Sequence, residues 1–453
     1  MTPEVSIHPT PALDEHPSLG ETHRSVPVPH TGGFWKRLLA FAGPAFLISV
    51  GYMDPGNWAT DIEGGARFRY QLLWVILASN LIAMLLQTLS ARLGLVTGRD
   101  LAQACREHFK PPVAFALWLL AEVAIAACDL AEVLGSAIAI NLLFPQVPLL
   151  YAVLLTALDV LLLLALQRFG MRLIEAIIVT LILTVAGCYL IEIFLARPDW
   201  GGIGHGMATP ILPPGSLYIA LGILGATVMP HNLYLHSALV QSRRVEREPA
   251  AIRTALKFNL LETVIALNGA FFVNAAILIM AAAVFFEHGR TVTGIQEAYS
   301  TLSPLLGAPV ASTVFAVALL ASGQSSTITG TLAGQVVMEG FVRLKVAPWL
   351  RRLITRSLAI IPAVIVIALN GRGGPAQQSQ AIYNLLILSQ VVLSLQLSFA
   401  TIPLVMFTGD KRKMGEFVNP PWIKWAAWIV VIGIALLNLY LLTQQVSAWL
   451  HPK

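Results

Sequence analysis

Long runs of apolar residues, each about the length needed to cross a bilayer, follow one another along most of the chain. Such runs predict transmembrane helices, because about 20 apolar residues in an α-helix cover the hydrocarbon core of a membrane. We expect eleven spans, near residues 38–64, 71–95, 112–144, 148–167, 173–195, 216–240, 256–286, 310–341, 353–370, 382–407 and 423–446. The pattern therefore predicts an all-α polytopic membrane protein.

Two of these runs are interrupted by polar and helix-breaking residues at mid-depth. The first contains "VGYMDPGNWATD", residues 50–61, and the sixth contains "GATVMPHNLYLHS", residues 225–237. Aligning Pro55 with Pro230 superimposes the two interruptions, and each proline lies in the first span of a five-span half. Because each half has an odd number of spans, the second half starts on the opposite side and the repeat is inverted. Paired interruptions of this kind are the best sequence indication of a transporter's binding site.

The same pattern divides the chain into four parts. We expect a disordered cytoplasmic N-terminal tail over 1–35, a first five-helix repeat over 36–200, an inverted second five-helix repeat over 210–410, and an eleventh helix with the C-terminus over 415–453. The tail has six prolines and four histidines in its first 32 residues and lacks the apolar segment of a signal peptide. Its histidines could bind metal weakly, but a plain polar tail is the simpler interpretation.

Composition and charge support this topology. The 453 residues are 56% hydrophobic and 12% charged, whereas soluble domains carry roughly 25% charged residues. If the N-terminus is cytoplasmic and the C-terminus outside, 23 of the 29 Lys and Arg residues lie on the inner side, as the positive-inside rule requires. The net charge of +5 thus reflects topology and gives no reason to expect a nucleic-acid partner. No GxxxxGK[ST] phosphate loop is present, so uphill transport would need an ion gradient.

The interruptions have a physical explanation. Pro55 and Pro230 each remove a backbone donor and clash with a carbonyl one turn earlier, while Gly56 relaxes the chain. Freed carbonyl oxygens are tolerated at this depth only where they are buried in protein or line a cavity that holds an ion or water. We therefore expect the two breaks to form a site at the midplane.

The polar groups beside the breaks favour a cation. They are the Asp54 carboxylate, the Asn57 amide oxygen, the Met229 thioether and freed carbonyls such as that of Ala226. Mg²⁺ and Ca²⁺ prefer shells made only of oxygen, whereas a thioether is a soft ligand. A methionine in a membrane helix usually serves packing, but its place beside Pro230 indicates a transition metal. The shell fits Mn²⁺, Fe²⁺ or Cd²⁺ and does not rank them.

A face of span three carries three acids. In "AEVAIAACDLAEVLG" the helical repeat places Glu122, Asp129 and Glu132 within about 80° of one another. Intramembrane acids usually line relays or cavities, so these are candidates for a proton pathway. Span nine opens with possible cationic partners for them, Arg351, Arg352 and Arg356. A cluster of arginines at a cytoplasmic helix end is also expected from topology alone.

At these residues the chain resembles a known family. "DPGNWATDIEGGA" in span one and "MPHNLYLHS" in span six are similar to the two signature segments of the Nramp (natural resistance-associated macrophage protein) family of proton-coupled divalent-metal transporters. The resemblance runs from about residue 35 to the C-terminus, and eleven spans agree with bacterial members, which are mostly manganese importers. It implies the fold of sodium-coupled amino-acid transporters, two inverted five-helix repeats with broken helices 1 and 6, plus one extra helix.

The resemblance also implies roles for individual residues. Asp54, Asn57, Met229 and the Ala226 carbonyl would coordinate the metal, and Gln390 in "LILSQVV" of span ten would add an oxygen as the site closes. The proton-linked groups beside the metal would be Asp54 and His231, with a polar exit network of Asp129, Glu132 and Arg352.

Other polar residues near the breaks have supporting roles. His231 follows Pro230 directly, where its imidazole could take a proton from Asp54. His236 projects roughly 140° away around the helix, so we expect it to be a hydrogen-bonded structural residue. Thr227 in span six and Asn274 in "FFVNAAIL" of span seven would orient waters or ligands.

We therefore expect a proton-coupled importer of Mn²⁺ or another divalent transition metal in a bacterial plasma or inner membrane. It would need no cofactor; its partners would be the metal ion, protons and the lipid bilayer, with no obligatory protein partner. The alternatives are a carrier of the same fold for Mg²⁺ or for an amino acid with Na⁺, a passive metal channel, and a non-transporting receptor. An enzyme is not expected, because no activated nucleophile or HExxH metal motif is present.

Overall fold

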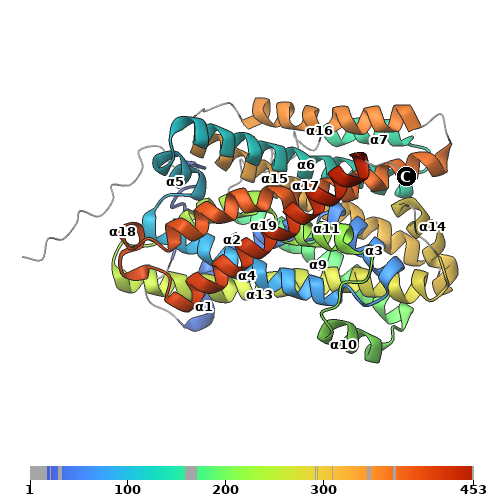
Figure 1. Cartoon of the computed structure of the whole chain (residues 1–453), viewed down its shortest axis with the longest axis horizontal. Helices are drawn as coiled ribbons and strands as arrows, with labels where there is room; N and C mark the ends of the chain where they lie inside the picture. The colour runs from blue at the N-terminus through green and yellow to red at the C-terminus, as the bar shows by residue number, and fades with distance from the viewer. Residues whose placement is uncertain are drawn as a thin grey trace, which may run out of the picture.

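The protein forms a bundle of long helices. The computed structural model describes residues 18–20, 22–28, 33–158, 171–290, 292, 294–308, 310–343, 348–370 and 374–450. Figure 1 shows the long helices side by side, with short helices gathered at the two ends of the bundle. At one end lie α1 (Phe34–Phe41), α5 (Leu101–His108) and α18 (Lys411–Met414); at the other lie α10 (Trp200–Ala208) and α14 (Ile295–Leu306).

Among the described residues, eight helices are long and apolar enough to cross a membrane. They are α4 (Leu73–Thr97), α6 (Pro111–Leu143), α9 (Met171–Ala196), α13 (Pro249–Ala281), α15 (Val310–Val342), α16 (Pro348–Asn370), α17 (Pro375–Thr408) and α19 (Pro421–Leu450). In α15, 72% of the most apolar stretch is buried inside the protein, compared with 22% in α9 and α16. The helix α15 is thus surrounded mostly by protein. In contrast, α9 and α16 expose apolar side chains on the outside of the bundle, as expected for helices that face lipid; Phe194 of α9, for example, is 82% exposed.

The remaining three predicted spans are interrupted or partly outside the described residues. Span one is built from α2 (Pro44–Gly51) and α3 (Pro55–Phe68), and span six from α11 (Leu217–Thr227) and α12 (Pro230–Leu239). Span four begins with α7 (Leu149–Leu155) and the 3₁₀ turn η1 (Thr156–Leu158), and residues 159–170 are not among those described. Pro55 and Pro230 each occupy the first turn of the helix after the break, where a missing N–H costs no intrahelical bond.

The start of span one differs from the sequence prediction. We expected it near Leu38, but that residue belongs to the separate helix α1, and span one begins at Pro44. Gly43 divides the two helices, since its φ of +149° lies in a region that L side chains rarely adopt. On α1, Phe34, Trp35 and Leu39 are exposed, so this short helix carries an apolar face outside the bundle.

The structure differs from the expected disordered tail over residues 1–35 at residues 18–20 and 22–28. Leu19 and Val26 are buried, the Leu19 N–H donates to Glu339 Oε2 at 2.9 Å, and β1 (Val26–Pro27) pairs in parallel with β2 (Arg243–Arg244). We call the described residues 18–20 and 22–28 the N-terminal strap. The tail was expected to be disordered because its composition is polar and rich in proline. Composition does not show that a few apolar side chains and backbone groups bind to a part of the protein that is distant in sequence.

Close packing of α3 on α13 generates a test of the fold. A Cβ atom added at Gly65 would lie 2.3 Å from the Leu278 carbonyl oxygen, whereas one added at Gly187 of α9 would meet nothing within 4 Å. Because overpacking typically costs about 1–3 kcal/mol, Gly65→Ala should lower the thermal unfolding midpoint of the protein in detergent. Gly187→Ala is the matched control and should leave the midpoint unchanged or slightly raised. Equal midpoints for the two variants would contradict this helix contact.

Candidate functional site

The first break carries two buried oxygen atoms with no partner. Asp54 caps α3, and its Oδ1 accepts a hydrogen bond from the Asn57 backbone N–H at 2.8 Å. The Asn57 side-chain Nδ2 donates to the Tyr52 carbonyl at 2.8 Å, which fixes the direction of its amide. Both residues are at most 1% exposed, and Asp54 Oδ2 and Asn57 Oδ1 have no hydrogen-bond partner among the described residues. Such atoms are costly to bury and are the ones available to a ligand.

The second break carries a sulfur and a carbonyl. Met229 is fully buried between α11 and α12, where it packs with Ala124 and Cys128 of α6 and Leu393 of α17. The residue one turn after Ala226 is Pro230, which has no N–H, so the Ala226 carbonyl lacks its helical donor. Ala226 is itself fully buried.

Gln390 of α17 lies against both breaks. Its Oε1 has no partner among the described residues, and its Nε2 donates to Ser389 Oγ at 3.0 Å. A Cβ atom at Gly56 would lie 1.7 Å from Gln390 Nε2, and one at Gly225 would lie 2.1 Å from the Gln390 carbonyl oxygen. These two glycines therefore let α17 approach the breaks, and the structure brings Gln390 to the place where the resemblance located it.

The carbonyls of the first break are held by neighbouring helices. Asn274 of α13 donates to the Tyr52 carbonyl at 2.7 Å, and Ser322 of α15 donates to the Met53 carbonyl. Asn274 was predicted as a supporting residue, whereas Ser322 was not, because nothing in its own span distinguishes it from the other small polar residues there. Thr227, also predicted, bonds its own helix at the Ile223 carbonyl, 2.7 Å away.

The two histidines of span six have different surroundings. His231 is 1% exposed, directly after Pro230, and its Nδ1 has no partner among the described residues. His236 is bonded at both ring nitrogens, to Gln87 Oε1 at 3.0 Å and to Asn259 Nδ2 at 3.4 Å. The hydrogen bonds expected for His236 are therefore present, and its structural role stays a prediction.

The acids of span three fall in two environments. Asp129 and Glu132 are buried and face Gly330 of α15, since a Cβ there would lie 3.4 Å from Asp129 Oδ1 and 3.1 Å from Glu132 Oε1. Glu122 is half-buried and accepts a hydrogen bond from Trp118 Nε1 at 3.1 Å. The three predicted acids thus lie on the same helix, α6, but Glu122 is about two helical turns before Asp129.

Arg356 is the cation that reaches these acids. Its Nη1 lies 3.6 Å from Glu132 Oε2, and both side chains are at most 2% exposed. The side chains of Arg351 and Arg352 lie outside the described residues. Of the three arginines named from sequence, Arg356 is the one whose side chain the structure describes, and it lies beside Glu132.

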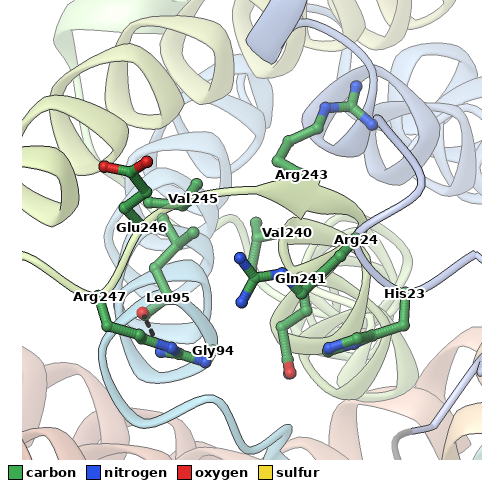
Figure 2. Close-up of a pocket in the computed structure, with 10 residues that line it drawn as sticks. All are labelled: His23, Arg24, Gly94, Leu95, Val240, Gln241, Arg243, Val245, Glu246 and Arg247. Atoms are coloured by element: carbon green, nitrogen blue, oxygen red, sulfur yellow. Dashed lines mark hydrogen bonds between the residues drawn. The ribbon is translucent and has the colours of Figure 1, made fainter. Parts of the chain in front are cut away.

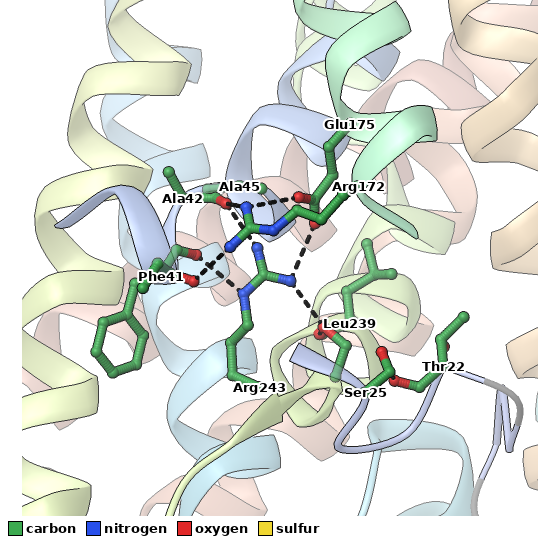
Figure 3. Close-up of polar contacts among 12 residues, drawn as sticks. Thr22, Ser25, Phe41, Ala42, Ala45, Arg172, Glu175, Leu239 and Arg243 are labelled. Carbon is green, nitrogen blue, oxygen red and sulfur yellow. Dashed lines mark hydrogen bonds and ion pairs between the residues drawn. The ribbon is translucent and has the colours of Figure 1, made fainter. Parts of the chain in front are cut away.

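A polar network at the α5 end was missed by the sequence analysis (Figure 3). Arg243 donates to the carbonyls of Phe41 and Ala42 and pairs with Glu175 Oε1 at 3.0 Å. Arg172 also pairs with Glu175, at 2.9 Å. Glu262 accepts hydrogen bonds from the N–H groups of Gly43 and Ala45 at 2.6 and 2.9 Å. We call Arg172, Glu175, Arg243 and Glu262 the inner anchor, since together they hold the joint between α1 and α2. The signal available in the sequence was the presence of Glu175 and Glu262 within apolar spans.

The two breaks lie against the same stretch of α17, and beside them are the buried Asp54 carboxylate, Asn57 amide and Met229 thioether. No group of three or more His, Cys, Asp or Glu side chains placed to hold a metal is found among the described residues. A cation there would instead have a mixed shell of oxygen and sulfur.

Comparisons with known proteins identify the family of the chain. Residues 45–444 match a family described as "Natural resistance-associated macrophage protein-like". A relative from Nostoc sp., named divalent metal cation transporter MntH, is 57% identical over 441 residues, which are 96% of this chain and 98% of the relative. The crystal structure of a manganese transporter from Eremococcus coleocola is similar with a TM-score of 0.88 and 43% identity, covering 96% of this chain and 93% of that one.

A more distant structure shows how widely the fold is shared. Mhp1, a nucleobase-cation-symport-1 family transporter, matches with a TM-score of 0.60 at 14% identity, over 98% of this chain and 97% of that one. At this identity the similarity concerns the fold alone. The predicted fold class, an inverted five-helix repeat with broken helices 1 and 6 and one added helix, is confirmed.

The unpartnered Asp54 oxygen generates a test of the site. Asp54→Asn removes the charge but keeps an oxygen that can cap α3, so the fold should be retained. We expect Cd²⁺ affinity, measured by titration calorimetry in detergent, to fall by more than the roughly 10–100-fold typical for loss of an outer-shell partner. Asp410→Asn is the matched control, since Asp410 also caps a helix, α18, by accepting the Arg412 N–H at 2.9 Å. Unchanged Cd²⁺ affinity in Asp54→Asn would exclude this carboxylate as a ligand.

Proposed function

Because the chain belongs to the Nramp family of metal transporters, we propose that it is a proton-coupled secondary importer of divalent transition metal ions. The chain is a multi-pass membrane transporter of divalent metal and not an enzyme. Mn²⁺ is the proposed principal substrate, as in the relatives named manganese transporters, with Fe²⁺ and Cd²⁺ as further substrates. One observation carries this proposal: Asp54 Oδ2, Asn57 Oδ1 and Gln390 Oε1 are buried without a hydrogen-bond partner among the described residues, and Gln390 lies against both helix breaks.

The mixed donor set supports a transition metal in preference to Mg²⁺. Asp54 and Asn57 supply hard oxygens, and the Ala226 carbonyl and Gln390 Oε1 can add two more. Met229 supplies a soft ligand, which later or more polarisable divalent ions bind better than Mg²⁺ does. An amino-acid substrate would not require a carboxylate and a thioether at this point.

We propose that alternating access acts on this site through the broken helices. The half-helices α2 and α12 lead from the breaks toward the α5 end, and α3 and α11 lead toward the α10 end. Movement of one pair of halves relative to the surrounding helices would open the site to one side at a time. Asn274 and Ser322, which bond the unwound segment from α13 and α15, would hold the site together during this movement.

The proposed proton route begins at the metal ligand. Metal binding at Asp54 requires the carboxylate form, so a proton on this group has to leave when metal arrives. His231, with its unpartnered Nδ1 directly after the second break, is the proposed first acceptor. Asp129 and Glu132, with Arg356 paired to Glu132, are the proposed continuation on α6, and Glu122 lies further along the same helix.

The charges also support an orientation. We propose that the end of the bundle with α1, α5 and α18 is cytoplasmic, because the loops there carry most of the Lys and Arg residues. Figure 1 places the end of α19 at the opposite end from α1, which fits an odd number of spans. The C-terminus would then lie outside the cell membrane.

Uptake into proteoliposomes tests the function directly. With an inward proton gradient and a fluorescent pH reporter inside, we expect Mn²⁺ and Cd²⁺ uptake accompanied by internal acidification, and no uptake of Mg²⁺. Empty liposomes and the Asp54→Asn variant are the controls. Metal flux without acidification would identify an uncoupled channel, and Mg²⁺ uptake would mean that Met229 does not determine selectivity.

The role of the sulfur has its own test. Met229→Leu keeps the volume of the side chain, a change that usually costs less than about 1.5 kcal/mol, but removes the thioether. We expect Cd²⁺ uptake to fall several-fold more than Mn²⁺ uptake, because the softer ion loses more. Met280→Leu is the matched control, as Met280 is also fully buried but lies on α13 away from the breaks. Equal losses for the two metals in Met229→Leu would indicate that the sulfur serves packing alone.

A further inference from the structure

The N-terminal strap joins several helices at the end we propose is cytoplasmic. Its Leu19 N–H donates to Glu339 of α15, and its Arg24 N–H donates to the Gln241 carbonyl at 3.0 Å, directly after α12. Farther along, Val26 pairs with Arg243 and Pro27 with Arg244, so the strap lies beside the inner anchor. The strap therefore contacts both the central helix and the segment that follows the second broken span.

A small pocket lies between the strap, the end of α4 and the segment that joins α12 to α13 (Figure 2). His23 and Arg24 come from the strap, Gln241 from the turn after α12, and Arg247 from the segment before α13. Figure 2 shows these four side chains directed toward a common gap. The pocket has about 310 Å³ of atom-free space, part of which is open solvent.

The charge of this pocket is unbalanced. Arg24 and Arg247 bring two guanidinium groups, and the only acidic side chain among the described lining residues is Glu246, which Figure 2 shows turned away from the gap. Arg247 uses one of its donors on the Leu95 carbonyl at 3.1 Å, which leaves others available. Arg243 also lines the pocket, but its guanidinium points to Glu175 in the inner anchor.

Titration shifts of groups outside the spans agree with this imbalance. Burial, and then the charges of Arg24 and Arg247, lower the pKa of His23 from its ordinary 6.5. Burial, and then the charges of Arg24 and Arg99, lower the pKa of Arg247. Arg99 has an acidic partner of its own, Glu107 at 3.1 Å. The pocket thus holds cationic groups close enough to repel one another.

We propose that His23, Arg24 and Arg247 form a binding site for a phosphate group, either an inorganic phosphate or the headgroup of an anionic lipid. Guanidinium groups bind phosphate oxygens through paired N–H donors, and the Gln241 amide offers a further donor. The anion would offset the repulsion between the strap and the Arg247 segment. Its binding would therefore fasten the strap over the α5 end of the bundle.

Direct binding of two oxyanions to the full-length protein in detergent tests the site. Phosphate and sulfate are titrated by calorimetry at constant ionic strength in chloride. We expect saturable binding that weakens at least about tenfold in Arg24→Gln or in Arg247→Gln, because each variant removes one charge-assisted donor pair. Arg253→Gln is the matched control, since Arg253 is exposed on the same face and pairs with Glu416 at 2.5 Å, and it should change affinity less than about twofold.

Hydrogen exchange of the strap supplies a readout that general surface charge would not move. The Leu19 and Arg24 amides donate to Glu339 and Gln241, so both should exchange more slowly when the anion is bound. In Arg247→Gln, which leaves the strap sequence intact, the anion should not slow them. The proposal is overturned if neither oxyanion nor anionic lipid binds saturably to the unaltered protein, or if the Arg24, Arg247 and Arg253 variants lose affinity equally.

Nanodiscs distinguish the two sources of the phosphate group. Strap exchange is compared in phosphatidylcholine alone, in phosphatidylcholine with added inorganic phosphate, and in phosphatidylcholine containing phosphatidic acid. Slower exchange with inorganic phosphate identifies a soluble anion as sufficient, and slower exchange only with phosphatidic acid identifies a lipid headgroup. In either case Arg247→Gln must abolish the effect, and persistence of the effect in that variant overturns the site.

The pH dependence tests the contribution of His23. A bound anion favours the imidazolium form and so raises the pKa of His23 from its lowered value in the free protein. Sulfate stays dianionic between about pH 5.5 and pH 7.5, so a rise in its affinity as the pH falls through this window would report protonation of His23. Phosphate is unsuitable here, because it changes its own charge in the same window and its titration would overlap with that of His23. His23→Gln should remove that rise, whereas a rise of the same size in the variant would exclude His23 from the site.

Discussion

The breaks that Pro55 and Pro230 open in spans one and six are the constraint on which the rest of the structure depends. Each proline begins a half-helix in the middle of the bundle, and the unwound backbone beside it needs hydrogen-bond donors at a depth where water cannot supply them. At the first break, Asn274 and Ser322 supply donors from other helices. Asn274 of α13 and Ser322 of α15 therefore satisfy backbone carbonyls of the first break. The buried oxygens that remain without a partner among the described residues are the ones that a cation can bind.

Close approach of α6 and α17 to the breaks is the second requirement, because these helices enclose the site from the sides. Gly56 and Gly225 leave space for Gln390, and Gly135 of α6 lies where a Cβ would be 2.1 Å from Pro55. With any larger residue at these positions, α6 and α17 would stand farther from the breaks and the donor atoms would spread apart. The glycines thus determine the size of the site, whereas the prolines determine its position.

The sequence predicted those parts of the structure that follow from local chemistry. The two breaks and the inverted repeat follow from proline, glycine and apolar spacing, which act within a few residues, whereas the place of Gln390 came from the family resemblance alone. The strap, the separate helix α1 and the inner anchor were not predicted, because they depend on contacts between distant segments. Arg243 and Glu175, for example, are 68 residues apart, and neither has a local pattern that names its partner. Likewise, the choice of Arg356 as the cation beside Glu132 depends on how α16 lies against α6.

The inner anchor restricts how the site can open toward the α5 end. Guanidinium groups of Arg172 and Arg243 bond the carbonyls at the end of α1, and Glu262 accepts the first N–H groups around α2. Any movement of α2 away from α13 has to exchange these charge-assisted bonds for contacts with water, which is cheaper than exposing an apolar interface because water can replace each polar partner. Gly43, whose φ of +149° is accessible to glycine but rarely to other residues, forms the joint between α1 and α2. A ligand shifts an equilibrium between two states only by its difference in affinity for them, so the proposed transport cycle would require metal and proton to bind unequally to anchored and released forms of α2.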